Sequence, residues 1–143
     1  LNTAHQLILE NAKPTLGTVE LLSVLQNNGA RYAICSNSRS EEIHTVLKTT
    51  KLDKFFADMP IFGREMVQKG KPASDIYLFA LKEMNVLPQN AVVVEDSLNG
   101  VMASVGAGIQ TVVFTGGTGF LGMNRFVERF GSIPNISSMA DLI

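Results

Sequence analysis

The sequence predicts an α/β fold, in which a mostly parallel sheet is covered by helices on both faces. Two observations lead to this prediction. Short apolar runs rich in β-branched residues alternate with amphipathic segments of helical period. No internal repeat, low-complexity stretch or long linker interrupts that alternation. Ligands of such sheets bind outside the carboxyl ends of the strands, so polar residues at those ends are the candidates for chemistry.

The first half of the chain holds three of the predicted helices and two of the predicted strands. Helices are expected up to about residue 10, over 18–27 and over 40–48, and the sequence "NNG" ends the second of them. The run "RYAIC" at 31–35 is expected to form a buried strand, and 58–63 to contain a short one.

The second half of the chain repeats the alternation. The segment "KGKPAS" at 69–74 is expected to be a loop, and Ser74 or Asp75 can cap the helix that follows it. The remaining expected elements are a strand at 91–94, a helix over 98–106, a strand at 110–114 and a helix over 120–130.

Composition and charge limit the functions that the chain can have. Its 143 residues are 45% hydrophobic, enough for one domain with a core. The 12 basic and 13 acidic residues give a net charge of −1, which offers no electrostatic case for nucleic acid. No basic cluster or long apolar run indicates a membrane. The single cysteine, Cys35, excludes an internal disulfide and fits a reducing, cytoplasmic compartment.

The start of the sequence has neither an initiator methionine nor the pattern of a signal peptide. We therefore expect the chain to be a piece of a longer protein or a processed product.

Two adjacent carboxylates, Glu95 and Asp96, end the apolar run at 91–94. Ionised carboxylates are rarely buried unless they are paired or bind a metal. Ser36 also follows a predicted strand, so the three residues can share one crevice. Consecutive strand residues point to opposite faces, so both carboxylates reach one ion only if the chain leaves the strand there. Asp96 is the safer ligand.

Three segments, in this order, carry a resemblance to a known family: "ICSNS" at 34–38, "GKPASDIY" at 70–77 and "VVVEDSLNGV" at 92–101. Together they resemble the haloacid dehalogenase-like (HAD) hydrolase superfamily, above all its β-phosphoglucomutase and phosphatase-like members with a helical cap. The resemblance extends over nearly the whole chain. It implies a Rossmannoid parallel sheet and Mg²⁺-dependent phosphoryl transfer from a small phosphorylated metabolite such as a sugar phosphate.

The resemblance also assigns roles to individual residues. Phosphoryl transfer depends mainly on positioning and on neutralising negative charge. The Ser36 hydroxyl corresponds to a donor to a phosphoryl oxygen, and Asn37 can add a backbone or side-chain donor. Lys71 matches the family's compact cation for phosphoryl oxygens. Asp96 and Glu95 match an acidic pair that resembles a Mg²⁺ site.

The family's first motif, an apolar strand followed by Asp-x-Asp, is not found in this sequence. The aspartates are Asp53, Asp58, Asp75, Asp96 and Asp141, and no two of them are separated by one residue. The resemblance implies that residues 1–13 are the tail of a cap domain and that 14–143 form a core without its central strand. We therefore expect the chain alone to be inactive, with the missing segment supplied by the same or another chain.

Other interpretations of these segments remain open. The complete protein could be a phosphomutase, and the chain could be a non-catalytic phosphate-binding module. Ser36 could be a helix cap, whereas Cys35 is expected to be a core residue and no nucleophile. Gly116, Gly119 and Gly122 follow a predicted strand and resemble a dinucleotide-binding turn. Such dehydrogenases need a second strand that ends in an acidic residue and a Tyr-x-x-x-Lys motif, and the sequence after Gly122 has no convincing second strand, nor does the chain contain that motif.

Overall fold

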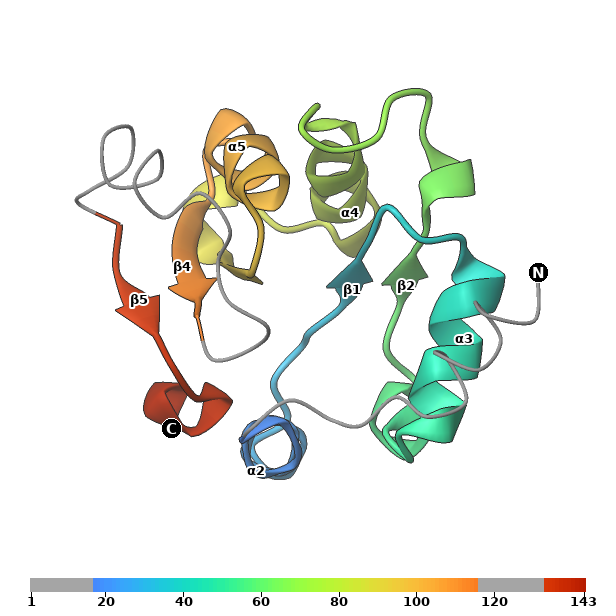
Figure 1. Cartoon of the computed structure of the whole chain (residues 1–143), viewed down its shortest axis with the longest axis vertical. Coiled ribbons are helices and arrows are strands. Elements are labelled where there is room, and N and C mark those ends of the chain that lie inside the picture. Colours follow the sequence, from blue (N-terminus) through green and yellow to red (C-terminus); the bar gives the residue numbers. More distant parts are fainter. Residues whose placement is uncertain (1–16, 116–132) are drawn as a thin grey trace.

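The computed structural model describes residues 17–115 and 133–143. The helices predicted up to residue 10 and over 120–130 lie outside the described residues, as does the glycine-rich turn at 116–122. In Figure 1, helices α4 and α5 lie on one side of the strands, and α2 and α3 lie on the other. The predicted layering, with helices on both faces of parallel strands, is therefore confirmed.

Four α-helices and five strands make up the described residues. The helices are α2 (Thr18–Asn27), α3 (Ser40–Thr49), α4 (Asp75–Met84) and α5 (Leu98–Gly106). The strands are β1 (Ile34–Cys35), β2 (Ile61–Phe62), β3 (Val92–Glu95), β4 (Gln110–Phe114) and β5 (Asn135–Ile136). Four short 3₁₀ helices join them: η1 (Asp53–Phe56), η2 (Arg64–Met66), η3 (Pro88–Asn90) and η4 (Met139–Leu142). None of the described helices has the length and apolarity needed to cross a membrane.

Most of the predicted elements agree with the structure, but two strands differ from their predictions. The segment 31–35 was expected to be a buried strand, whereas only Ile34 and Cys35 form a ladder and both are half-buried. The strand expected at 91–94 runs from Val92 to Glu95, so the first carboxylate belongs to the strand itself.

The predicted cap of α4 is wrong. Neither Ser74 nor Asp75 accepts a hydrogen bond from the first turn of this helix. The Ser74 hydroxyl donates instead to the carbonyl of Ala103 in α5, at 2.8 Å. The Asp75 carboxylate accepts from the backbone N–H of Lys69, at 3.3 Å. Both side chains therefore tie α4 to other segments, which local sequence spacing does not reveal.

The described strands form two separate parallel sheets. One contains β1 and β2, with Ile34 opposite Ile61, and the other has the order β3-β4-β5. In the described residues, no ladder joins β1 to β3. Each of these two strands therefore has one edge without a strand partner in the described part of the chain.

Alternation along β1 and β2 divides the core into two layers. Ile34 and Ile61 pack against the cluster beneath α2 and α3, which is built on Leu22, Ile43, Leu47, Leu52 and Phe55. Cys35 and Phe62 face the opposite cluster, under α4 and α5. Val93 of β3 packs against this second cluster as well, so helix α4 bridges the two sheets.

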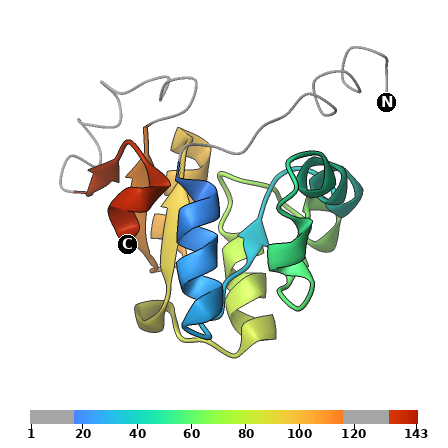
Figure 2. The same cartoon turned by 90° about the horizontal axis from the view of Figure 1, so that it is seen from below.

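The carboxyl-terminal segment packs against the start of α2, and Figure 2 shows the two side by side. Gly17 precedes the helix with φ of 80°, a left-handed conformation that favours glycine. A Cβ atom there would lie 2.4 Å from the backbone nitrogen of Ala140. Glycine is therefore required both by the conformation and by the close contact.

Candidate functional site

Lys71 connects the carboxyl ends of the two sheets. Its ammonium Nζ donates to the carbonyl of Cys35, the last residue of β1, at 2.9 Å. It also donates to Oε2 of Glu95, the last residue of β3. Three of the residues singled out in the sequence, Ser36, Lys71 and Glu95, therefore meet at one edge of the strands, as the parallel-sheet rule predicts.

Lys71 and Glu95 form a largely buried ion pair, with side chains 9% and 6% exposed. The Tyr77 hydroxyl donates to the same Glu95 oxygen, and its ring centroid lies 5.0 Å from the Lys71 Nζ. A buried carboxylate needs such partners, since an unpaired one would be strongly disfavoured. The strand thus carries Glu95 to a cation, and that cation in the structure is Lys71.

Tyr77 is a member of the site that sequence reasoning missed. It is 6% exposed and lies in the first turns of α4. Burial and the neighbouring Glu95 charge raise the pKa of its hydroxyl, so the group stays protonated and keeps donating. Its place in "GKPASDIY" was a weak signal, because a tyrosine on the buried face of a helix is usually a core residue.

Gly100 makes room for the Glu95 carboxylate at the start of α5. A Cβ atom at this position would lie 2.0 Å from the carboxyl carbon of Glu95. The helix itself begins with Ser97, whose hydroxyl accepts from the Gly100 N–H at 3.1 Å. The glycine in "SLNG" is therefore needed for the close approach of a charged side chain.

Asp96 is exposed, directly after the end of β3. Mg²⁺ takes one or two carboxylates together with waters and substrate oxygens. Asp96 fits that donor set, whereas Glu95 already accepts hydrogen bonds from Lys71 and Tyr77. Among residues 17–115 and 133–143, no cluster of three or more His, Cys, Asp or Glu side chains could hold a metal by itself. The assignment of Asp96 and Glu95 to Mg²⁺ stays a prediction.

Ser36 does not cap a helix, so that alternative is wrong. Its backbone N–H donates to the Phe62 carbonyl at 3.1 Å, and its hydroxyl oxygen accepts from the Ser38 N–H at 3.0 Å. This turn fixes the hydroxyl of the residue that directly follows Cys35, whose carbonyl Lys71 contacts. The Ser36 hydroxyl hydrogen is a donor of the kind that a phosphoryl oxygen requires.

The amino end of α3 is capped from another loop, by Glu65. Its carboxylate accepts from the Ser40 N–H at 2.9 Å and from the Ser40 hydroxyl. These hydrogen bonds lower the pKa of Glu65 to about 2. The cap therefore carries a full negative charge at the positive end of the helix.

The Asn37 side chain is hydrogen-bonded to the backbone of Lys71 in both directions. Its Oδ1 accepts from the Lys71 N–H at 2.8 Å, and its Nδ2 donates to the Lys71 carbonyl at 3.2 Å. The side-chain amide predicted to contact phosphate is thus already bonded to a neighbouring loop. The Lys71–Pro72 peptide bond in that loop is cis.

Cys35 is half-buried and packs against the core, in agreement with the prediction. It packs against the cluster under α4 and α5. Burial raises the pKa of its thiol to about 12, with the Lys71 charge opposing that shift. A thiol with such a pKa carries almost no thiolate at neutral pH, so it is a poor nucleophile.

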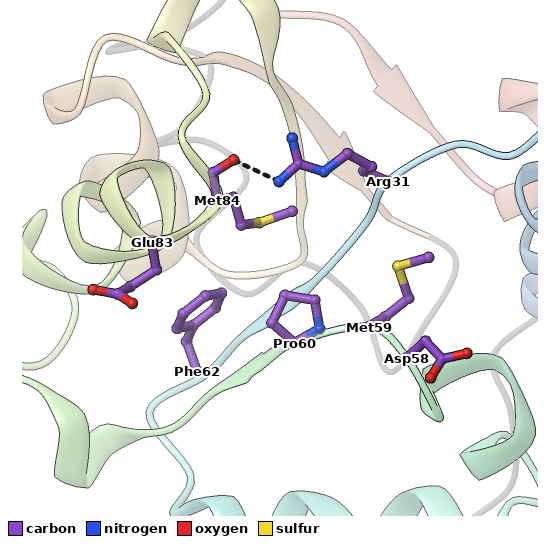
Figure 3. Close-up of a pocket in the computed structure, with 7 residues that line it drawn as sticks. All are labelled: Arg31, Asp58, Met59, Pro60, Phe62, Glu83 and Met84. Carbon is purple, nitrogen blue, oxygen red and sulfur yellow. Dashed lines mark hydrogen bonds between the residues drawn. The ribbon is translucent and has the colours of Figure 1, made fainter.

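A cavity of about 370 Å³ lies at the opposite edge of the sheet β1-β2 (Figure 3). Its lining includes Arg31, which precedes β1, Pro60, which precedes β2, and Met84, at the end of α4. The Arg31 guanidinium donates to the Met84 carbonyl across one side. This cavity is at the amino ends of the strands, away from Lys71, and none of the predicted site residues lines it.

Comparison with known proteins places this geometry in a family. The sequence matches the family described as haloacid dehalogenase-like hydrolase over residues 1–114. The chain is 35% identical over 103 residues to a phosphorylated carbohydrates phosphatase of Thermotoga maritima, covering 72% of this chain and 47% of that protein. It is 30% identical over 142 residues to a beta-phosphoglucomutase of Mycobacterium bovis, covering 97% of this chain and 53% of that protein.

The fold agrees with solved structures of the same family. A HAD family hydrolase from Deinococcus radiodurans, solved with bound phosphate and sodium, superposes with a TM-score of 0.86 at 27% identity. The match covers 96% of this chain and 60% of that one. The chain thus spans about half the length of the two relatives it matches in sequence. Its sequence match, its parallel strands and its structural likeness together show that the chain belongs to the haloacid dehalogenase-like hydrolases.

Proposed function

We propose that the complete protein is a Mg²⁺-dependent phosphatase of small phosphorylated metabolites such as sugar phosphates. The observation that carries the proposal is the position of Lys71, whose ammonium joins the carboxyl ends of β1 and β3 beside Ser36 and Asp96. A fixed cation at this edge of a parallel sheet is suited to neutralising phosphoryl charge. The phosphorylated carbohydrates phosphatase among the relatives supports the substrate class.

Each residue has a role that its contacts support. The Ser36 hydroxyl donates to a phosphoryl oxygen, because its own oxygen is already held by the Ser38 N–H. Lys71 neutralises charge on the phosphoryl oxygens while Glu95 and Tyr77 hold it in place. The buried ion pair keeps the ammonium from moving during the reaction, which lowers the reorganisation needed in the transition state.

Asp96 is the residue that we propose to hold Mg²⁺. Its carboxylate is exposed at the carboxyl end of β3, and bound Mg²⁺ would polarise a phosphoryl oxygen there. Glu95 is the predicted assistant, and its main contact in the structure is with Lys71. Isothermal titration of Mg²⁺ into the complete protein should show binding that Asp96→Ala weakens at least about tenfold. The control is Asp58→Ala, which removes an exposed carboxylate beside the cavity at the amino ends of β1 and β2. Equal weakening of Mg²⁺ binding by both variants would contradict the assignment.

The attacking carboxylate is proposed to come from a segment outside the described residues. The family resemblance places it in an Asp-x-Asp motif after an apolar strand. The edges of β1 and β3, each without a strand partner in the described part of the chain, support a strand lying between them. That strand would be parallel to both sheets and would end beside Ser36 and Lys71.

The phosphatase proposal is tested with a panel of phosphomonoesters and the complete protein. Lys71→Met should lower kcat/KM by about 10² or more, because the charge of the phosphoryl oxygens is left uncompensated. Lys69→Met removes an exposed lysine from the same loop and should change kcat/KM little. Equal activity of Lys71→Met and Lys69→Met would contradict the role of Lys71. Absence of turnover by the unaltered protein would contradict the proposed function.

A phosphomutase is the second candidate, since the match to a beta-phosphoglucomutase covers 97% of this chain. Both activities would use the same residues of this site, and they differ in the product. Incubation with a sugar 1-phosphate releases inorganic phosphate if the protein is a phosphatase. Conversion to the 6-phosphate without phosphate release would favour the mutase.

A further inference from the structure

The backbone of Lys71 is held by one side chain from the loop after β1. Asn37 Oδ1 accepts from the Lys71 N–H at 2.8 Å, and Nδ2 donates to the Lys71 carbonyl at 3.2 Å. An asparagine amide offers one donor group and one acceptor group on a single rigid plane. Both groups are used on the same residue, so the side chain fixes the position and the orientation of that peptide unit.

The loop lies unusually close to Asn37 because residue 70 is glycine. A Cβ atom at Gly70 would lie 2.8 Å from Asn37 Oδ1 and 2.6 Å from Arg64 Nε. The Arg64 guanidinium in turn donates to the carbonyl of Val67 at 2.9 Å and to that of Gln68 at 3.3 Å. The segment leading to Lys71 is thus held by Arg64, and Asn37 holds its last residue.

Lys71 is therefore fixed at both ends of its side chain. The backbone end is bonded to Asn37, and the ammonium is bonded to the Cys35 carbonyl and to Glu95. A free lysine side chain loses rotamer entropy when it is ordered. Holding the backbone in place keeps the ammonium at the edge of β1 without that cost in each catalytic cycle.

We propose that Asn37 is a positioning residue that acts through Lys71 and makes no side-chain contact with phosphate. This inference deepens the proposed function and rests on it. The amide cannot turn toward a phosphoryl oxygen without breaking both hydrogen bonds to Lys71. Removal of Asn37 therefore acts on the transition state through a misplaced ammonium and leaves ground-state binding of the substrate nearly unchanged.

A double-mutant cycle in the complete protein separates this role from direct phosphate binding. Asn37→Ala should lower kcat about tenfold with KM changed less than about twofold, because a displaced catalytic group costs rate. In the Lys71→Met background the same substitution should have no further effect. Asn90→Ala, an exposed asparagine in η3, is the matched control and should leave kcat unchanged. The same loss in both backgrounds would overturn the proposal.

Amide hydrogen exchange in the complete protein tests the contact without any enzyme activity. Loss of Asn37 should speed exchange of the Lys71 N–H by about tenfold, since one hydrogen bond protects it. Asn37→Asp keeps an acceptor and should give a smaller increase, and Asn90→Ala should give none. Unchanged exchange at Lys71 in Asn37→Ala would overturn the proposal. If exchange rises as expected but the complete protein hydrolyses no phosphomonoester, the phosphatase function fails while the contact stands.

Discussion

Strands β3 and β4 have similar β-branched sequences but very different environments. Val92 of β3 is 59% exposed and the valines after it are only half-buried. In β4, every residue after Gln110 is buried, and Val113 is 0% exposed. The difference follows from their neighbours, because β4 lies between β3 and β5 whereas β3 pairs only with β4 in the described residues. A β-branched sequence favours a strand, but the number of partner strands beside it determines how far its side chains are buried.

The same reasoning applies to the second sheet. Strand β1 pairs with β2 over two residue pairs, and its side chains are half-buried, like Val93 and Val94 of β3. Neither strand has a fully buried apolar side chain, and the carboxyl ends of the two strands are joined by Lys71. In the described part of the chain, the candidate site therefore lies between two strand edges that have no strand partner.

The largest effect on stability and activity is expected when an added strand pairs with the edges of β1 and β3. The 143-residue chain alone should show no Mg²⁺-dependent phosphatase turnover. Mixing it with a peptide that carries an apolar strand followed by Asp-x-Asp should raise the melting temperature and produce turnover together, because paired edges bury apolar surface and the carboxylate attacks phosphorus.

The matched control is the same peptide with both aspartates replaced by asparagine. It should raise the melting temperature equally and give no turnover. Robust turnover by the 143-residue chain alone, abolished by Asp96→Ala, would contradict the prediction and would mean that the nucleophile lies within the chain.

Removing the ion pair between Lys71 and Glu95, which joins the two sheets, should have the next largest effect. Lys71→Met leaves Glu95 buried with only the Tyr77 hydroxyl as a partner, which should cost about 3 kcal/mol of unfolding free energy. Replacing both members, Lys71→Met with Glu95→Gln, should recover part of that loss, since no unpaired charge remains. Urea denaturation measures both. A loss below about 1 kcal/mol for the single variant would show that the pair contributes little.

Valine-to-alanine substitutions test the contrast between β3 and β4 directly. Val113→Ala should cost about 2 kcal/mol, because this side chain is fully buried against Val101 of α5. Val93→Ala should cost less than about 1 kcal/mol, because Val93 is half-buried. Addition of the strand peptide should raise the cost at Val93 and leave that at Val113 unchanged. Equal costs in the chain alone would refute the explanation from strand neighbours.

The sequence predicted the elements whose signals are local. The helices over 18–27 and 98–106 and the strand over 110–114 agree with the structure at both ends, because helix stops and apolar runs are encoded in neighbouring residues. The prediction for 31–35 was too long, because the length of a ladder depends on partner strands. Only Ile34 and Cys35 face a partner in β2.

The structure brings together residues that the sequence singled out, but the contacts between them were not predicted. Ser36, Lys71 and Glu95 were singled out from strand ends and motif order, and the structure brings them together. The pairing of Glu95 with Lys71 and the contact of Asn37 with the backbone of Lys71 join residues at least 24 positions apart. No local spacing encodes such contacts. Tyr77 was missed for the same reason, since only the fold brings its hydroxyl to Glu95.

The smallest effect expected concerns Glu65, an exposed carboxylate that contrasts with the buried Glu95. Its pKa falls from an ordinary 4.5 to about 2, chiefly through the side-chain and backbone hydrogen bonds of Ser40. A folded-state pKa below the unfolded value gives stability that is present above about pH 4.5 and is lost as the pH falls towards about 2. Glu65→Gln should therefore be slightly less stable than the unaltered chain at neutral pH and should approach it near about pH 2.

Melting temperatures measured between about pH 2 and pH 6 test this prediction. Glutamine can still accept from the Ser40 N–H but loses the second acceptor oxygen, so only the pH-dependent part of the difference between the two curves reports the Glu65 charge. Glu83→Gln, which removes an exposed carboxylate near the end of α4, is the matched control for the loss of one negative charge. A constant offset between Glu65→Gln and the unaltered chain across this range would show that the cap has no protonation-linked contribution. Glu65 and Glu95 would then differ only in how deeply their carboxylates are buried.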